Sequence, residues 1–146
     1  AGKPKNAAMP NHPFLQELIA GLETIRLDGD TRQEVCLSKV SSGVCGLVDD
    51  LLIVDAKKKI CRIRDYKITA DILTSQVKFF APFTFLEGNK LHKNYLQLSF
   101  YAYLMESAGW KVEGIDVFNW NGMWAKYSLE RKDMIKIMMQ IGVCLA

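Results

Sequence analysis

Acidic residues and one lysine on two neighbouring segments offer the clearest chemistry in this sequence. Asp49 and Asp50 interrupt the apolar run GLVDDLLIV, and the later run RIRDYKIT contains Asp65, Tyr66 and Lys67 in succession. Because strand side chains alternate between faces, Asp65 and Lys67 project to one side and Tyr66 to the other. A carboxylate inside an apolar strand is costly unless it is paired or binds a metal. The pattern predicts a site where acids from two strands meet an amine.

These residue types suit the hydrolysis of a phosphodiester. Magnesium prefers oxygen ligands, usually one or two carboxylates with water and phosphate oxygens. Bound metal activates water, and a nearby ammonium stabilises the charge that develops on phosphorus. Asp49 and Asp65 would supply carboxylates, the backbone carbonyl of Tyr66 a further oxygen, and Lys67 the ammonium. The simpler alternative is a solvated pair of Asp65 and Lys67 at a strand end, the usual position of charged residues.

A later segment, NYLQLSFYAYL, places a polar residue inside an apolar helix. Gln97 and Tyr101 are four residues apart and share a helical face, with Lys93 one turn earlier. An aromatic residue such as Tyr101 normally packs in the core of a domain. Gln97 has no such explanation, so we expect it to contact a phosphate or Lys67.

Periodicity and turn signals predict helices and strands in the order α-β-β-β-α-β-β-α. The expected ranges are 14–25, 33–40, 44–54, 60–69, 90–108, 111–120, 123–129 and 131–143. Residues 70–88 are expected to form an irregular connection with a short helix. The long helix 90–108 then acts as a crossover between strands, which implies an α/β (α+β) fold with a central mixed sheet flanked by helices.

The chain has 146 residues, of which 49% are hydrophobic and 24% charged, and its net charge of +3 permits a polyanionic partner. This length fits one domain, at 14–146, after a flexible lead-in at 1–13. No apolar run reaches the length of about 18–20 residues that spans a bilayer, so we expect a cytoplasmic, intracellular protein without membrane contact. The four cysteines lack metal-site spacing and are expected to be buried free thiols.

In combination, these segments resemble the PD-(D/E)XK nuclease superfamily, in particular its RecB-like or lambda-exonuclease-like branch. That branch carries G-x-x-D on one strand, D/E-x-K on the next and Q-x-x-x-Y on the following helix. The resemblance covers residues 34–101. The matching residues are Gly46 with Asp49, Asp65 with Lys67, and Gln97 with Tyr101.

The resemblance implies a restriction-endonuclease-like core and a metal-dependent deoxyribonuclease that uses Mg²⁺ or Mn²⁺. Such a protein would be an exonuclease or another DNA-processing nuclease of recombination, repair or phage type. It implies that Asp49 and Asp65 hold the metal, that Lys67 assists the attacking water, and that Gln97 and Tyr101 shape the site and meet DNA. A homo-oligomer or a larger helicase–nuclease assembly is a further expectation.

Four residues are lesser candidates. Asp50 is the register alternative to Asp49, although G-x-x-D spacing favours Asp49. Glu34 lies on the preceding strand, where family members often carry an acid, and His12 is the histidine nearest to the upstream position where many members have a metal ligand. Lys93 completes the set. Two other functions remain open: an inactive nucleic-acid-binding or interaction module on the same fold, and an α/β domain whose acids are neutralised by basic neighbours.

Overall fold

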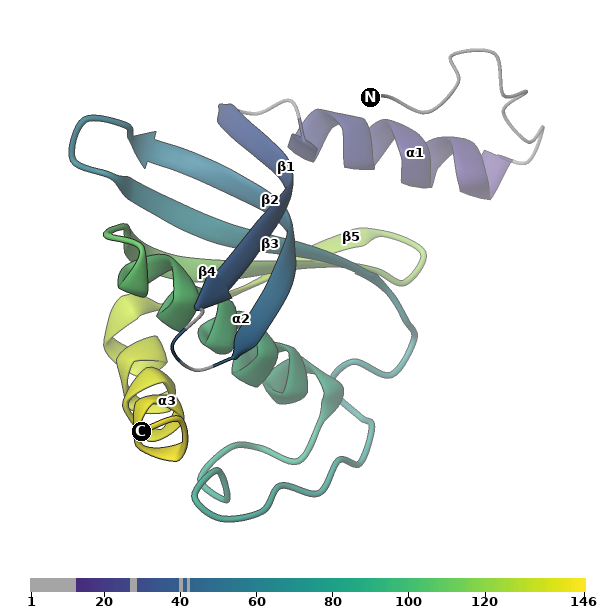
Figure 1. Ribbon diagram of the computed structural model, residues 1–146. Coiled ribbons are helices and arrows are strands. Elements are labelled where there is room, and N and C mark those ends of the chain that lie inside the picture. The colour runs from purple at the N-terminus through teal and green to yellow at the C-terminus, as the bar shows by residue number, and fades with distance from the viewer. Residues whose placement is uncertain (1–12, 27–28, 40, 42) are drawn as a thin grey trace.

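The computed structural model describes residues 13–26, 29–39, 41 and 43–146. The fold is α+β, with a five-stranded mixed sheet and three helices in a restriction-endonuclease-like core (Figure 1). The elements are α1 (Pro13–Arg26), β1 (Asp30–Lys39), β2 (Val44–Asp55), β3 (Ile60–Ile68), α2 (Lys90–Ser107), β4 (Lys111–Trp120), β5 (Trp124–Glu130) and α3 (Arg131–Cys144). None of the helices in the described ranges is long and apolar enough to cross a membrane.

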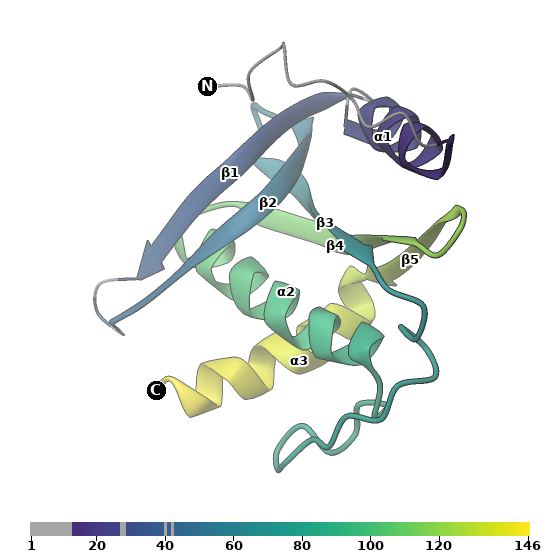
Figure 2. The ribbon, with the colours of Figure 1, turned by 90° about the vertical axis from the view of Figure 1, so that its right-hand side faces the viewer.

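The sheet has the strand order β1-β2-β3-β4-β5. The β3–β4 pair is parallel and the other pairs are antiparallel. A parallel pair requires a crossover, and α2 provides it. Helices α2 and α3 pack against each other and cover one face of the sheet, whereas α1 lies apart from them (Figure 2).

Helix α1 is attached to the rest of the chain through the indole of Trp124. The indole Nε1 donates a hydrogen bond to the carbonyl oxygen of Leu18 at 3.2 Å. Gly21 allows this contact, because a Cβ at that position would lie 2.4 Å from Cδ1 of Trp124. The side chain at position 124 therefore anchors α1.

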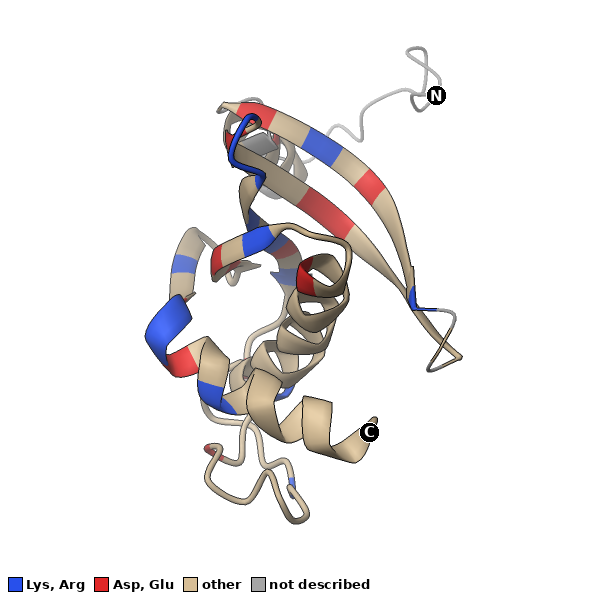
Figure 3. Ribbon diagram, turned by 60° about the vertical axis from the view of Figure 1, so that its left-hand side comes forward, with Lys and Arg blue, Asp and Glu red and all other residues tan. Residues whose placement is uncertain are grey.

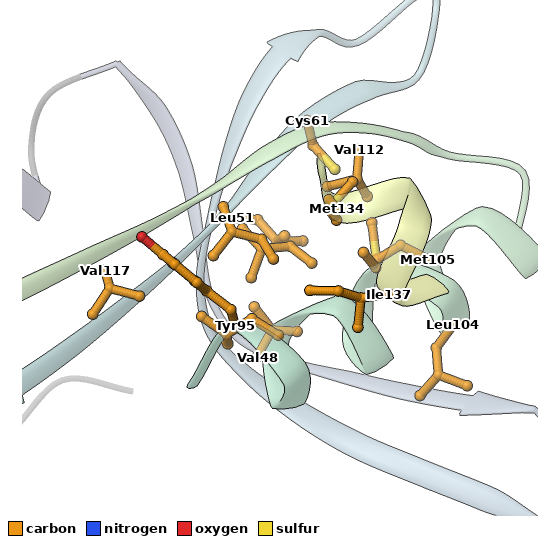
Figure 4. Close-up of a cluster of buried hydrophobic side chains, with 14 of the residues drawn as sticks. Val48, Leu51, Cys61, Tyr95, Leu104, Met105, Val112, Val117, Met134 and Ile137 are labelled. Carbon is orange, nitrogen blue, oxygen red and sulfur yellow. The ribbon is translucent and has the colours of Figure 1, made fainter. Parts of the chain in front are cut away.

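The hydrophobic core lies between the sheet and the α2–α3 pair, and aliphatic residues dominate it. Figure 4 shows Leu51 of β2 close to Tyr95 of α2, with Met134 and Ile137 of α3 completing the layer. On β3, Cys61 and Ile63 point into this core and are fully buried, because they alternate with Arg62 and Arg64. The strand thus sends apolar residues to the helices and basic residues to the opposite face.

The predicted element order is confirmed, with most boundaries within one or two residues. The first strand begins at Asp30, three residues earlier than expected, and pairs with β2 from there. The short helix expected within 70–88 is wrong: this segment consists of turns and extended chain. Pro82 lacks the amide donor a helix needs, and the segment is tied instead by Val77 N to Gly88 O at 2.9 Å. Of the expected lead-in, residues 1–12 lie outside the described residues.

The expectation of buried thiols is wrong for three cysteines. Cys36, Cys45 and Cys144 are exposed, and Cys61 is buried. The two β-strand cysteines point away from the helices, because the outer face of the β1–β2 ribbon has no covering layer at that end. An apolar run in a strand buries only the residues that face another layer.

Candidate active site

The two motif strands separate at the point where their carboxylates lie. The β2–β3 pairing ends at Asp50 and Arg64. Beyond that pair, the first half of β2 continues along β1 alone, and the end of β3 continues along β4. Asp49 and Asp65 follow immediately on the two diverging strands. The opening between the strands leaves room for both side chains to meet under α2.

Asp65 is the buried member of this carboxylate pair. It is 5% exposed, and Oδ2 lies 3.2 Å from Nζ of Lys67. Burial raises the pKa of Asp65 to about 7, and a hydrogen bond with the Asp49 carboxyl adds to the rise, while the charge of Lys67 opposes it. Apart from that ion pair, Oδ2 accepts no hydrogen bond from any described residue. Asp65 therefore has less stabilisation than a buried carboxylate requires.

Helix α2 closes the site from the other side through a glycine contact. A Cβ at Gly46 would lie 2.4 Å from Cε1 of Tyr101, so the tyrosine ring rests directly on the β2 backbone three residues before Asp49. Nε2 of Gln97 donates a hydrogen bond to the Tyr101 hydroxyl at 3.1 Å. The glycine, glutamine and tyrosine of the sequence pattern thus form one contact between strand and helix.

The second aspartate of β2 lies on the opposite face of the sheet. Asp50 is fully buried, and its Oδ2 accepts hydrogen bonds from Nε and Nη2 of Arg64 at 3.0 and 2.6 Å and from the Tyr66 hydroxyl. The neighbouring Arg62 binds Asp116 on the same face. The structure therefore groups Asp49, and not Asp50, with Asp65. It also directs the Tyr66 side chain away from Asp65.

The donor set fits a hard divalent cation. Asp49 and Asp65 offer carboxylate oxygens. Burial of Asp65, the neighbouring Asp49 carboxyl and the lack of a hydrogen-bond donor to Oδ2 among the described residues other than Lys67 leave the charged form of Asp65 poorly stabilised, which a bound cation would remedy. No group of three or more His, Cys, Asp or Glu side chains that could hold a metal occurs in the described part of the chain. The other ligands would be the Tyr66 carbonyl, waters and a substrate phosphate, as is usual for magnesium.

The lesser candidates are dispersed. Glu34 is exposed, with a φ of 53°, on the strand next to β2. Lys93 is exposed on α2 and lines a cleft with Lys67. His12 lies outside the described residues. Figure 3 shows the acidic pair as one red band on β2, although its two side chains go to different faces.

Sequence reasoning missed three polar residues that line the cleft beside Lys67: Thr69, Lys90 and Asn94. The signal was present for α2, because Lys90, Asn94 and Gln97 recur at helical spacing on the face that carries Tyr101. Thr69 gave no such signal, since its position depends on where β3 ends.

No protein-family model matches the chain, and no curated protein matches it. Among solved structures it is similar to a putative exonuclease from Eubacterium rectale, with a TM-score of 0.54 and 14% identity over 90% of this chain and 52% of that chain. It is also similar to the crystal structure of SSO0001, with a TM-score of 0.46 and 18% identity over 88% of this chain and 58% of that chain. The chain thus spans little more than half the length of either structure. At these identities the likeness concerns the fold.

Proposed function

We propose that this chain is a metal-dependent deoxyribonuclease that hydrolyses phosphodiester bonds. The observation that carries the proposal is the buried Asp65, held between the Asp49 carboxyl and the Lys67 ammonium where β2 and β3 diverge. A strongly raised carboxyl pKa beside specific charged partners is typical of functional sites. The fold shared with a structure named as a putative exonuclease supports this class.

Asp49 and Asp65 would hold Mg²⁺ or Mn²⁺, with the carbonyl of Tyr66 as a third protein oxygen. When bound, the metal supplies Lewis-acid chemistry and lowers the pKa of a coordinated water. Asp65 is rigid because it lies on a buried strand, whereas Asp49 is exposed and faces the substrate side. The pair would therefore hold the cation beside the sheet, where a substrate phosphate could reach it.

Lys67 would orient the attacking water and stabilise the charge that develops on the phosphate oxygens. Its side chain lies two residues beyond Asp65 on the same face, and its ion pair to Oδ2 fixes the ammonium at 3.2 Å. Gln97, held by the Tyr101 hydroxyl, would offer its amide to the DNA backbone from the helix side.

The test is incubation of labelled linear and circular DNA with Mg²⁺, with Mn²⁺ and with chelator, together with a matched RNA. We expect DNA cleavage that chelator abolishes, and loss of cleavage in Asp65→Ala and Lys67→Ala while circular dichroism stays native. Lys58→Ala, in the exposed turn at the other end of the β2–β3 hairpin, is the matched control and should cleave normally. Unchanged cleavage by Asp65→Ala would overturn the proposal.

We also propose that the enzyme is an exonuclease or another DNA-processing nuclease of recombination, repair or phage type. A requirement for DNA ends would identify an exonuclease. DNA binding without metal uptake or cleavage would instead favour an inactive binding module. We also propose that the chain works within a homo-oligomer or a larger helicase–nuclease assembly.

A further inference from the structure

A cleft of about 540 Å³ adjoins the candidate active site, between the end of β3 and the first half of α2. Lys67, Ile68 and Thr69 line one side, and Lys90, Lys93, Asn94 and Gln97 line the other. The volume lies within the range of about 300–1,000 Å³ that is usual for ligand sites. Lys67 belongs both to the cleft and to the site, so the two are continuous.

The cleft is rich in hydrogen-bond donors. Three of its lining residues are lysines, and no acidic residue is among the described residues that line it. An ammonium has donors and no acceptor, while Asn94 and Gln97 add amide donors. A surface of this kind is complementary to an anion that carries several acceptor oxygens.

The three lysines of the cleft differ in whether they already form an ion pair with a carboxylate. Lys67 is paired with Asp65 at 3.2 Å, and Lys90 with Asp71 at 2.7 Å. Lys93 forms no ion pair with any described residue, and it is exposed one turn of helix from Gln97. Lys93 therefore holds the positive charge that is most available to a ligand.

We propose that this cleft binds a phosphate of the nucleic-acid strand next to the phosphate that is cleaved, with Lys93 as its principal cation. The inference rests on the proposed function, because the cleft opens beside Lys67. Asn94 and Gln97, one turn apart on the same helix, donate to the same phosphate or its sugar.

Asp71 binds two of the hydrogen-bond donors that line the cleft. Its Oδ1 accepts hydrogen bonds from Lys90 Nζ at 2.7 Å and from Thr69 Oγ1 at 2.6 Å. Both donors line the cleft, so the carboxylate occupies groups that a phosphate would otherwise use. Asp71 thus limits the affinity of the cleft, and its removal frees two donors.

The test measures binding of a fluorescent 20-nucleotide single strand and of the matching duplex by anisotropy, with Ca²⁺ in place of Mg²⁺ and a gel to verify intact DNA. Lys93→Ala should make the negative slope of log K against log salt shallower, by about 0.7 on the single strand and about 0.9 on the duplex. At 50 mM salt this corresponds to binding about eightfold to fifteenfold weaker. Lys93→Arg should restore the slope, and Asp71→Ala, which removes the acceptor, should tighten binding.

Lys58→Ala is the matched control, since it removes an exposed lysine charge in the turn before β3, and β3 spans about 27 Å between that turn and the cleft. The slope should be unchanged in this variant. A Lys93→Ala slope equal to that of the wild type overturns the cleft proposal, whether or not the protein cleaves DNA. Wild-type binding without cleavage, combined with a shallower slope for Lys93→Ala, supports phosphate binding in the cleft and overturns the nuclease proposal. A wild type that does not bind DNA overturns both.

Discussion

Asp50 and Arg64 form a buried ion pair on the reverse side of the sheet from Asp49 and Asp65. The side chains are 0% and 4% exposed, and Nη2 of Arg64 lies 2.6 Å from Oδ2 of Asp50. The two residues are also the last cross-strand pair before β2 and β3 diverge, and each is the sequence neighbour of one site carboxylate. The ion pair therefore fixes the backbone positions from which Asp49 and Asp65 project.

We expect removal of one partner of this pair to be strongly destabilising, because the other charge would remain buried. Asp50→Ala and Arg64→Ala should each lower the free energy of unfolding by about 3–5 kcal/mol in urea titrations. The double replacement Asp50→Leu, Arg64→Leu should cost less than either single change, because it leaves neither charge unpaired.

The control for this experiment is the exposed pair of Arg32 and Asp30, whose side chains are 60% and 52% exposed. Arg32→Ala should cost less than about 1 kcal/mol, because solvent screens such pairs. If Asp50→Ala cost no more than Arg32→Ala, the buried pair would not hold the strands in place.

The raised pKa of Asp65 predicts that the folding stability of the metal-free protein depends on pH. Because the pKa of Asp65 is about 7 in the folded state, above the usual aspartate value of 3.8, ionisation is unfavourable in the folded state, and stability falls as pH rises through about 7. In chelator at pH 8, Asp65→Asn should therefore be more stable than the wild type by about 2–4 kcal/mol. At pH 4 the two proteins should differ little, as thermal unfolding at both pH values would show.

Glu23→Gln, at an exposed position of α1, is the control and should not change the pH dependence. An Asp65→Asn protein that is less stable than the wild type at pH 8 would show that the ionised Asp65 carboxylate is well stabilised, which contradicts this prediction. Addition of Mn²⁺ should reduce the difference in stability between Asp65→Asn and the wild type at pH 8. The reason is that a bound cation stabilises only the wild type, which has both carboxylates.

The close contact between Gly46 and Tyr101 predicts intolerance to a single methyl group. Gly46→Ala would place its Cβ 2.4 Å from the ring, so the strand or helix must shift, at a cost of about 1–3 kcal/mol. Tyr101→Ala should make Gly46→Ala tolerable in a double mutant. The comparison is Gly142→Ala, where the nearest atom is 3.5 Å away and a helical alanine should be neutral or stabilising.

Cysteine exposure predicts the order of thiol modification. Cys36, Cys45 and Cys144 are exposed and should react with a water-soluble maleimide in the native protein. Cys61 is fully buried, and burial raises its pKa to about 12, so it should react only after unfolding. Mass spectrometry of native and denatured samples would count the adducts. Four rapid adducts in native conditions would contradict the packing of β3 against the helices.

The sequence by itself determined the element order and the spacing of the candidate residues. Local signals suffice for this, because hydrophobic periodicity and a turn such as Asn121-Gly122 depend on residues close together in the chain. The sequence also predicted an irregular connection before α2, but not that it lacks a helix, since contacts such as Leu91 N to Ile72 O at 3.1 Å join residues far apart in sequence.

Only the tertiary structure decided how neighbouring residues divide between two environments. Asp49 and Asp50 are adjacent, yet one joins Asp65 and the other binds Arg64 on the reverse face. The spacing favoured Asp49, but the burial of Asp65 and the contact of Gly46 with Tyr101 depend on where β2 leaves β3 and where α2 packs. Those positions result from long-range pairing, which no local pattern encodes.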